Sequence, residues 1–353
     1  MNRFAHLAGQ RVLVTGGTGF VGRHLLPRLL EAGAEVTCLV RASSRLDRLP
    51  TGVKTVVANL ENGQGLAEAL RGQDVLIHMA ALLFGLGWQD YLRANARAAH
   101  HLAAAIQGLD SPPRVVLVSS LAAGGPCGVA PGRGPEALPE PVSAYGWSKL
   151  YTEQTLGRVL GERLVIVRPP IIYGSGDQGL LPVFRGAARG VAVSPGWGRD
   201  FPVSVVHARD VAQAIMLCAR PGAAGVYYLS DGQPRSMAEF CRAMGHALGR
   251  PSGQPIRIVR LPLWLMAVTA AAASCAGILW ARTIQLLGGH APRRAPNWNL
   301  DKYREARQTG WLCDDRRIRQ ELGYAPEVDL ASGMAEAVAG YRQDGLLGRK
   351  ESV

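Results

Sequence analysis

The segment TGGTGFVG (residues 15–22) follows an apolar, β-branched run and precedes a helical pattern, and it constrains the fold more than any other feature of the chain. In such a strand–turn–helix, Gly16 permits a tight turn, Gly19 lets the backbone approach a pyrophosphate, and Gly22 allows close packing of helix on strand. The free N–H groups at the start of the helix then face the phosphates. The segment predicts a dinucleotide-binding turn, and a tight turn without a ligand is the alternative.

Apolar runs alternate with helix-length segments along the first half of the chain. Near-continuous apolar strands are typical of a parallel sheet that is covered on both faces. Their alternation with helices predicts a Rossmann-type, doubly wound α/β fold. Strands are expected at residues 11–16, 35–40, 53–58, 74–80, 114–120, 163–169 and 225–230, and a helix is expected at residues 20–32.

The alternation weakens after residue 170, which predicts a smaller α/β substrate-binding domain interleaved with the first. We expect residues 1–170 to form the dinucleotide-binding domain with 205–230 returning to it, 171–204 and 231–345 to form the substrate domain, and 346–353 to form a tail. Further helices are expected at 180–189, 236–248, 262–280, 315–322 and 330–342. Residues 121–141 are so rich in glycine and proline that a long loop is expected there.

Composition argues against several classes of function. The 6 cysteines show no CxxC spacing and no cluster with histidine, so neither a disulfide framework nor a metal site is expected. The net charge of +12 comes from scattered arginines without a basic run, which argues against nucleic-acid binding. Reduced thiols and an N-terminus without an apolar signal region predict a cytoplasmic protein.

The end of the second expected strand indicates which dinucleotide is bound. A strand that grips the adenosine ribose of NAD usually ends in Asp or Glu, whereas here RASSR supplies Arg41, Ser43, Ser44 and Arg45. Guanidinium groups and hydroxyls suit the 2′-phosphate of NADP. NADP is therefore the expected cofactor, with NAD as the alternative. An exposed arginine-rich loop without a ligand would have the same composition.

The segment SAYGWSKLYTEQ (143–154) places Tyr145 and Lys149 four residues apart, in a chain with only four lysines. On a helix this spacing puts both side chains on one face. A nearby ammonium lowers the pKa of a phenol, so Tyr145 could exchange a proton with a carbinol oxygen while a hydride moves. At the end of the preceding strand, Ser120 offers a hydroxyl to the same oxygen, and Ser119 is the alternative.

Over nearly its whole length the sequence resembles the extended short-chain dehydrogenases/reductases, the NAD-dependent epimerase/dehydratase superfamily. TGGTGFVG, HMAA (78–81), RANARAAHHL, VSS, YGWSK, RPPIIYGSGD (168–177) and VVHARDVAQAI (205–215) occur in the order typical of that family. The resemblance implies a catalytic set of Ser120, Tyr145 and Lys149, and a homodimer formed through two helices. It also implies a cofactor site made of Gly16, Thr18, Gly19, Phe20, Val21, Gly22, Arg41, Ser44, Arg45, Asn59, Leu60, Ala80, Ala81, Asn95, Tyr145, Lys149, Pro169, Ile171 and Ile172.

Two departures from the family pattern narrow the predicted chemistry. Sugar-nucleotide dehydratases follow the catalytic hydroxyl with an acidic pair, where this chain has Leu121 and Ala122. Many nucleotide-sugar epimerases have a diphosphate-binding asparagine where this chain has Ile171. With dehydratases and epimerases set aside, the sequence is similar to the branch of 3β-hydroxysteroid dehydrogenases, sterol-4-carboxylate 3-dehydrogenases and dihydroflavonol reductases.

We therefore expect an NAD(P)-dependent oxidoreductase that interconverts a secondary alcohol and a ketone on a hydrophobic, steroid- or terpenoid-like substrate. A 3-hydroxy-4-carboxylate substrate would also lose CO₂. The candidate substrate contacts are Leu121, Ala122, Ile172 and Arg199. Arg199 occupies a position near the one where epimerases place a phosphate-binding arginine. A nucleotide-sugar epimerase or reductase is therefore the alternative. A non-catalytic dinucleotide-binding protein is the third hypothesis.

Residues 261–281 contain no charged side chain. The segment is long enough to span a bilayer, but its many alanines give little drive for insertion, so a buried or membrane-surface helix is expected. Its composition is similar to the membrane-associated region of the sterol enzymes. Peripheral contact with a membrane through residues 261–281 is therefore expected for this protein.

Overall fold

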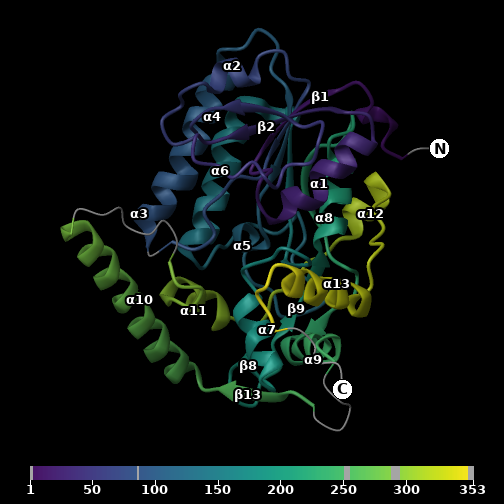
Figure 1. Ribbon diagram of the computed structural model, residues 1–353. Coiled ribbons are helices and arrows are strands. Elements are labelled where there is room, and N and C mark those ends of the chain that lie inside the picture. The colour runs from purple at the N-terminus through teal and green to yellow at the C-terminus, as the bar shows by residue number, and fades with distance from the viewer. Residues whose placement is uncertain (1–2, 86, 250–254, 288–294, 349–353) are drawn as a thin grey trace.

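The computed structural model of the chain describes residues 3–85, 87–249, 255–287 and 295–348. A parallel seven-stranded sheet lies at its centre, in the order β11-β6-β5-β4-β1-β2-β3 (Figure 1). The register places Val14 of β1 between Cys38 of β2 and Ile77 of β4. The strands are β1 (Arg11–Thr15), β2 (Glu35–Val40), β3 (Lys54–Val57), β4 (Val75–His78), β5 (Arg114–Val118), β6 (Leu164–Arg168) and β11 (Gly225–Tyr228).

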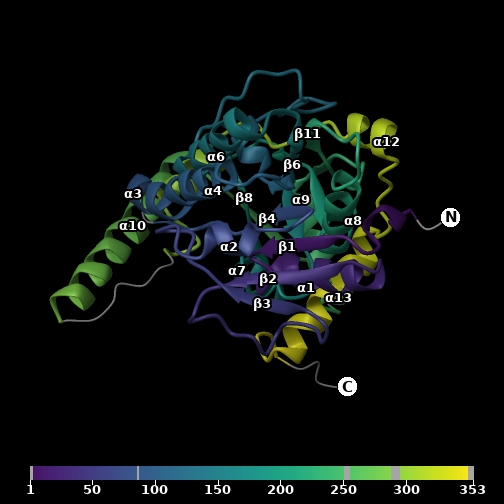
Figure 2. The same cartoon turned by 90° about the horizontal axis from the view of Figure 1, so that it is seen from above.

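Successive side chains of the strands enter two different cores, because the side-chain period of a strand is two. Val12 and Val14 pack with α1 (Phe20–Glu31), α8 (Ala208–Cys218) and α12 (Arg316–Leu322). Leu13 and Leu76 face the other way, toward α2 (Leu66–Leu70), α4 (Arg97–Gln107) and α6 (Ala144–Leu160). Figure 2 shows α1 on one side of the sheet and α4 with α6 on the other. The predicted doubly wound fold is confirmed.

A separate apolar core lies beyond the large sheet, among residues that follow β6. Its centre includes Tyr173, Phe184, Phe240 and Tyr341. Small two-stranded sheets pair β10 with β7, β12 with β9, and β13 with β8. The elements here are β7 (Ile171–Tyr173), α7 (Leu181–Ala188), β8 (Val191–Pro195), β9 (Pro202–Val203), β10 (Val205–His207), β12 (Arg235–Ser236), α9 (Met237–Ala247), β13 (Arg257–Leu261) and α13 (Leu330–Gln343).

The division of the chain into two domains stays a prediction. Within it, β11 belongs to the large sheet, where it pairs with β6. Residues 349–353 of the predicted tail lie outside the described residues. The remaining elements are η1 (Ala5–Leu7), α3 (Trp88–Tyr91), the π-helical turn η2 (Leu92–Ala96), α5 (Leu121–Gly124), η3 (Gly161–Arg163), α10 (Leu263–Leu286) and α11 (Leu300–Ala306).

The loop predicted for residues 121–141 begins with one turn of helix, α5, so that prediction is wrong for its first four residues. The Ser120 hydroxyl accepts a hydrogen bond from the backbone N–H of Ala122 at 3.1 Å and caps the turn. Gly125, at φ +104°, ends it. The seven-residue α11 was not predicted from the sequence.

The α10 helix lies along the outside of the molecule, away from the large sheet (Figures 1 and 2). Its buried residues, Met266, Ala270 and Ser274, are spaced four apart and form one narrow stripe. The expectation of a buried helix is therefore wrong, because the described residues leave the other faces of α10 exposed or only partly covered. Within the described part of the chain, α10 is the one helix long and apolar enough to cross a membrane.

Candidate active site

The catalytic residues predicted from the sequence meet at the start of α6. The Ser143 hydroxyl accepts a hydrogen bond from the N–H of Gly146 at 3.0 Å and caps the helix, which places Tyr145 in its first turn. A Cβ atom at Gly146 would lie 2.4 Å from the carbonyl oxygen of Ala122, so only glycine lets α5 pack this closely on α6. This packing brings the Ser120 hydroxyl next to the phenol of Tyr145, close enough to lower the pKa of that phenol.

The half-buried phenol of Tyr145 experiences opposing effects on its pKa. Burial is the largest and raises the pKa above the ordinary value for tyrosine. The ammonium of Lys302 and the hydrogen bond from Ser120 lower the pKa, while the carboxylate of Glu305 raises it. Because the effect of burial is the largest, the pKa of Tyr145 stays above its ordinary value. Tyr145 is therefore a phenol at neutral pH, which is the form that can donate a proton.

Lys149 is buried on the same helix, one turn further along. Its Nζ donates a hydrogen bond to the carbonyl oxygen of Val118, at the end of β5, at 2.7 Å. Burial lowers the pKa of Lys149 to about 8, and the field of Glu153 opposes that shift. The cation that lowers the pKa of Tyr145 here is Lys302, where we expected Lys149, because the strand carbonyl holds the Lys149 ammonium. The catalytic role of Lys149 stays a prediction.

The two serines after β5 have different surroundings. Ser119 is buried and its hydroxyl donates a hydrogen bond to Glu153. Glu153 in turn pairs with Arg168, with 2.5 Å between Nη2 and Oε2, and Arg168 donates to the hydroxyl of Tyr228 at 2.6 Å. Ser119 is therefore part of a buried polar network. Of the two, Ser120 is the serine whose hydroxyl affects the pKa of Tyr145.

Asn95, predicted near the cofactor, connects a loop after β4 to α6. Its side-chain amide pairs with the backbone of Leu82, accepting at 2.8 Å and donating at 3.2 Å. It also donates to the Ser148 hydroxyl at 2.9 Å, and that hydroxyl donates to the carbonyl oxygen of Tyr145 at 2.8 Å. Asn95 thus supports the first turn of α6 through Ser148.

The glycine-rich turn has the shape that a dinucleotide requires. Gly16 has φ +77°, and a Cβ there would lie 2.8 Å from the backbone N of Ala80. At Gly22 a Cβ would lie 2.0 Å from the carbonyl oxygen of Gly17. The α1 helix begins after Gly19 and has no side-chain cap, so its first N–H groups are available to phosphate oxygens. Thr18, Phe20 and Val21 complete this segment. These residues fit a dinucleotide.

The turn after β2 is preformed and exposed. The N–H of Ser44 donates to the carbonyl oxygen of Arg41, and the N–H of Arg41 donates to the Ser44 hydroxyl, both at 2.9 Å. Arg45 makes an exposed ion pair with Asp47 at 3.4 Å. Both guanidinium groups lie at the surface. Their contact with a cofactor stays a prediction.

The other predicted cofactor residues follow strand ends. The Asn59 side chain accepts from the N–H of Glu61 at 2.8 Å and so stabilises its own turn, next to Leu60. The N–H groups of Met79 and Ala80 donate to the Thr15 hydroxyl at 3.2 Å each, which fixes the backbone that continues to Ala81. Their cofactor contacts stay predictions.

The predicted substrate residues do not form one cluster. The Leu121 N–H donates to the carbonyl oxygen of Pro169 at 2.8 Å, and the Leu121 side chain packs with Tyr228 and Cys313. Ala122 is buried in α5, while Ile171 and Ile172 are half-buried in β7. Arg199 donates to the carbonyl oxygen of Gln308 at 2.8 Å. The α5–α6 packing places the backbone of Ala122 against Gly146, next to Tyr145, and the substrate roles stay predictions.

Residues 12–228 match the family model of the NAD dependent epimerase/dehydratase family. The chain belongs to this family. The resemblance predicted from the motifs is confirmed, and the protein is an NAD-dependent oxidoreductase of the NAD dependent epimerase/dehydratase family.

Three relatives of this family member are named as reductases or a dehydrogenase. A 4-hydroxy-2-methyl-3-oxo-4-farnesyl-3,4-dihydroquinoline-1-oxide ketoreductase of Stigmatella aurantiaca is 30% identical over 333 residues, covering 92% of this chain and 94% of the relative. A ceramide reductase of Caulobacter vibrioides is 29% identical over 345 residues, covering 95% and 96%. A 3-beta-hydroxysteroid dehydrogenase of Mycolicibacterium neoaurum is 31% identical over 268 residues, covering 68% and 70%.

Three charged residues of α11 lie against the first turn of α6 and were not predicted from the sequence: Asp301, Lys302 and Glu305. Asn299 caps α11 by accepting from the N–H of Lys302 at 3.0 Å, and this N-cap could have predicted the helix itself. No local signal predicts that a helix more than 150 residues after Tyr145 docks against it.

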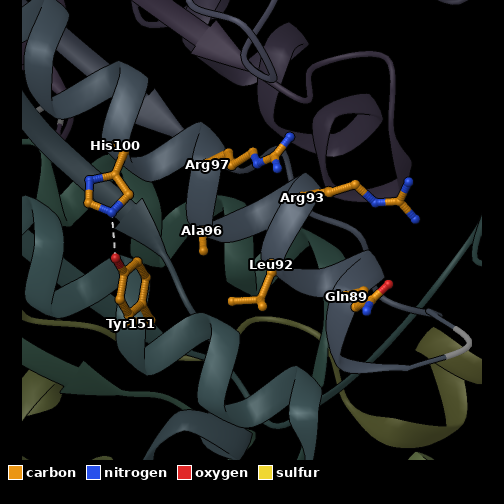
Figure 3. A pocket seen from close by; sticks show the side chains of 7 residues that line it. All are labelled: Gln89, Leu92, Arg93, Ala96, Arg97, His100 and Tyr151. Carbon is orange, nitrogen blue, oxygen red and sulfur yellow. Dashed lines mark hydrogen bonds between the residues drawn. The ribbon is translucent and has the colours of Figure 1, made fainter.

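A surface hollow of about 450 Å³ lies on the outer side of α4 and α6 (Figure 3). Helical periodicity places Tyr151, which lines it, about 120° around α6 from Tyr145. His100 of α4 hydrogen-bonds the Tyr151 hydroxyl across the hollow. The lining residues are Gln89, Leu92, Arg93, Ala96, Arg97, His100 and Tyr151. The hollow therefore lies apart from the predicted catalytic residues.

Proposed function

We propose that the protein interconverts a secondary alcohol and a ketone on a large apolar substrate, with NADP as the preferred cofactor. The observation that carries this proposal is the placement of Ser120 beside Tyr145, with apolar residues following Ser120 on α5 where a dehydratase has acids. A phenol and a hydroxyl suffice to protonate and orient one carbonyl oxygen.

The residues of the chain divide the work as follows. Ser120 donates a hydrogen bond to the carbonyl oxygen and orients it, and Tyr145 gives that oxygen its proton during reduction. In oxidation Tyr145 takes the proton from the hydroxyl. Lys149 and the N-terminus of α1 would hold the dinucleotide, together with the glycine turn. When bound, the nicotinamide supplies the hydride in reduction and accepts it in oxidation.

Two kinds of observation support an apolar substrate: the names of the relatives, and the residues at positions 171 and 199 of this chain. The names of all three relatives above include molecules with a large hydrocarbon part: a farnesyl group, a ceramide and a steroid. Ile171 occupies the position where many epimerases carry an asparagine for a diphosphate. Arg199, kept as a candidate for sugar-nucleotide phosphate, binds the carbonyl oxygen of Gln308 within the chain. Epimerisation is therefore the less favoured function.

The preference for NADP is supported by the turn after β2. Arg41 and Arg45 are exposed cations at the end of that strand, and no carboxylate occupies the ribose position between residues 41 and 45. A 2′-phosphate can accept charge-assisted hydrogen bonds from such guanidinium groups.

We also propose that the protein is a cytoplasmic homodimer that contacts membranes peripherally. Trp264 is 68% exposed and Trp280 63% exposed near the two ends of α10, as expected of interfacial anchors. A surface helix of this kind would place the protein where an apolar substrate is dissolved. For the dimer, Trp147 and Tyr151 are exposed on the outer face of α6 and could pack against a second copy.

The experiment supplies purified protein with NADPH or NADH and two panels of substrates. Ketones on prenyl, sphingoid and steroid skeletons form one panel, and UDP- and dTDP-sugars form the other. The proposal predicts turnover of at least one apolar ketone with NADPH, loss of about 10²- to 10³-fold in kcat in the Ser120→Ala variant, and no turnover of the sugars. Turnover confined to nucleotide sugars would overturn it.

A further inference from the structure

The helix α11 is fastened to the first turn of α6, where Tyr145 lies. The Asp301 carboxylate accepts from the backbone N–H of Ala144 at 2.6 Å and of Tyr145 at 3.2 Å. The Ser143 hydroxyl donates to Glu305 at 2.7 Å. Three hydrogen bonds that two acidic residues accept therefore fix the position of α11 relative to the phenol.

Lys302 lies between these two acidic residues and extends over the ring of Tyr145. Its Nζ is 4.7 Å from the centre of that ring and 5.6 Å from the centre of the Phe84 ring. It donates a hydrogen bond to Glu305 at 2.9 Å. With only 20% of its side chain exposed, the ammonium is shielded from solvent, so its field at the phenol is weakly screened.

We propose that Lys302 is a positioning residue for proton transfer: held by Glu305, its ammonium stabilises the phenolate form of Tyr145. This inference rests on the proposed function of Tyr145. In reduction the phenol O–H bond breaks, its proton joins the oxygen of the new alcohol, and Lys302 faces the phenolate that remains. In oxidation the same ammonium favours the phenolate that accepts the proton of the alcohol.

The charges around Tyr145 shift its pKa in the directions that this assignment requires. Lys302 lowers the pKa of the phenol and Glu305 raises it, while Ser120 of α5 lowers it through a hydrogen bond. From α3, the ring of Tyr91 lies 6.0 Å away, and burial raises its own pKa, so it stays neutral. Asp301 is engaged with the backbone of α6.

The division of labour between the two lysines follows from their contacts. The Lys149 ammonium is held at the end of β5 by the carbonyl oxygen of Val118, while that of Lys302 lies against the phenol ring. In the free protein, Lys302 should therefore control the titration of Tyr145 more strongly than Lys149 does.

The test is an NMR titration of the free protein labelled with [¹³Cζ]tyrosine, with the Tyr145 resonance assigned from Tyr145→Phe. We expect Lys302→Met to raise the pKa of Tyr145 by about 1 to 3 units, the range for an opposite charge at such a distance. Glu305→Gln keeps a hydrogen-bond acceptor but loses the negative charge, so it should lower that pKa. Lys54→Gln, at an exposed site on β3, is the matched control and should change nothing.

A purely structural role of Lys302 cannot produce opposite shifts in the two α11 variants. The proposal is overturned if Lys302→Met leaves the Tyr145 titration unchanged, or if Lys149→Met shifts it as much. In the oxidation direction, the acidic limb of the kcat/KM profile should move to higher pH in Lys302→Met and return in Lys302→Arg. Because the titration needs no substrate, its outcome is independent of whether the proposed reaction is the right one.

Discussion

The Asp301 carboxylate accepts a hydrogen bond from the backbone N–H of Tyr145, with 3.2 Å between Oδ2 and N, across 156 residues of sequence. A carboxylate at the N-terminus of a helix is stabilised by the free N–H groups there. The contact joins the helix that carries the predicted proton donor to the short helix beside α10. Substitutions at Asp301 should therefore affect both stability and activity.

Asp301→Ala removes the acceptor of two backbone N–H groups and should lower the free energy of unfolding by about 0.5 to 2 kcal/mol, as for the loss of an N-cap. The displaced α11 should also lower kcat/KM. Asp301→Asn keeps one acceptor oxygen and should fall between Ala and the parent. Chemical denaturation and steady-state kinetics measure the two effects. If the alanine variant matches the parent in both, α11 has no such role.

The cofactor preference depends on Arg41 and Arg45. Replacing both with alanine should raise the KM for NADPH by about 10²- to 10⁴-fold, since hydrogen bonds to charged groups contribute about 1.5–3 kcal/mol each. The KM for NADH should change little. Arg71→Ala, at the exposed end of α2, is the control. An equal rise for both cofactors would contradict a contact with the 2′-phosphate.

The glycine turn offers a test based on geometry alone. Gly22→Ala would place a methyl group 2.0 Å from the carbonyl oxygen of Gly17, so the turn must distort and dinucleotide binding should be lost. Gly87→Ala is a matched control, because Gly87 has extended backbone and no atom within 4 Å of the added Cβ. Fluorescence titration with NADPH compares the two variants. Parent-like affinity in Gly22→Ala would show that the turn holds no phosphate.

The exposed face of α10 should bind lipid. Leu279 and Trp280 are each 63% exposed, and replacing both with glutamate should abolish co-sedimentation with vesicles that contain anionic lipid. Activity on a short, water-soluble substrate should be retained, because both side chains are largely exposed on α10. Trp197, 76% exposed on the loop after β8, provides the control when replaced by serine. Unchanged vesicle binding in the double variant would contradict membrane contact through α10.

Much of the fold could be predicted because local patterns determine it. The apolar runs that became β1, β2 and β5 end within two residues of their predicted limits. The meeting of Ser120 and Tyr145 also follows from topology, since the carboxyl ends of parallel strands share one edge of a sheet. The turn α5 was missed because glycine and proline dominate its loop, although Ser120 caps it.

What could not be predicted depends on docking between distant segments. The position of Lys302 over Tyr145 is set by Asp301 and Glu305, whose partners on α6 lie more than 150 residues earlier. No spacing in the sequence encodes that contact. Whether α10 is exposed could not be predicted either, because composition alone cannot distinguish a helix that other segments cover from one that they leave uncovered.

The most direct test compares two tyrosines on different faces of α6. Tyr145→Phe removes the proton donor, and Tyr151→Phe removes a hydroxyl of the same helix that lies outside the predicted site. With NADPH and an apolar ketone, the account predicts a loss of about 10²- to 10⁴-fold in kcat for Tyr145→Phe, with parent-like cofactor binding, and little change for Tyr151→Phe. Undiminished kcat in Tyr145→Phe would contradict it.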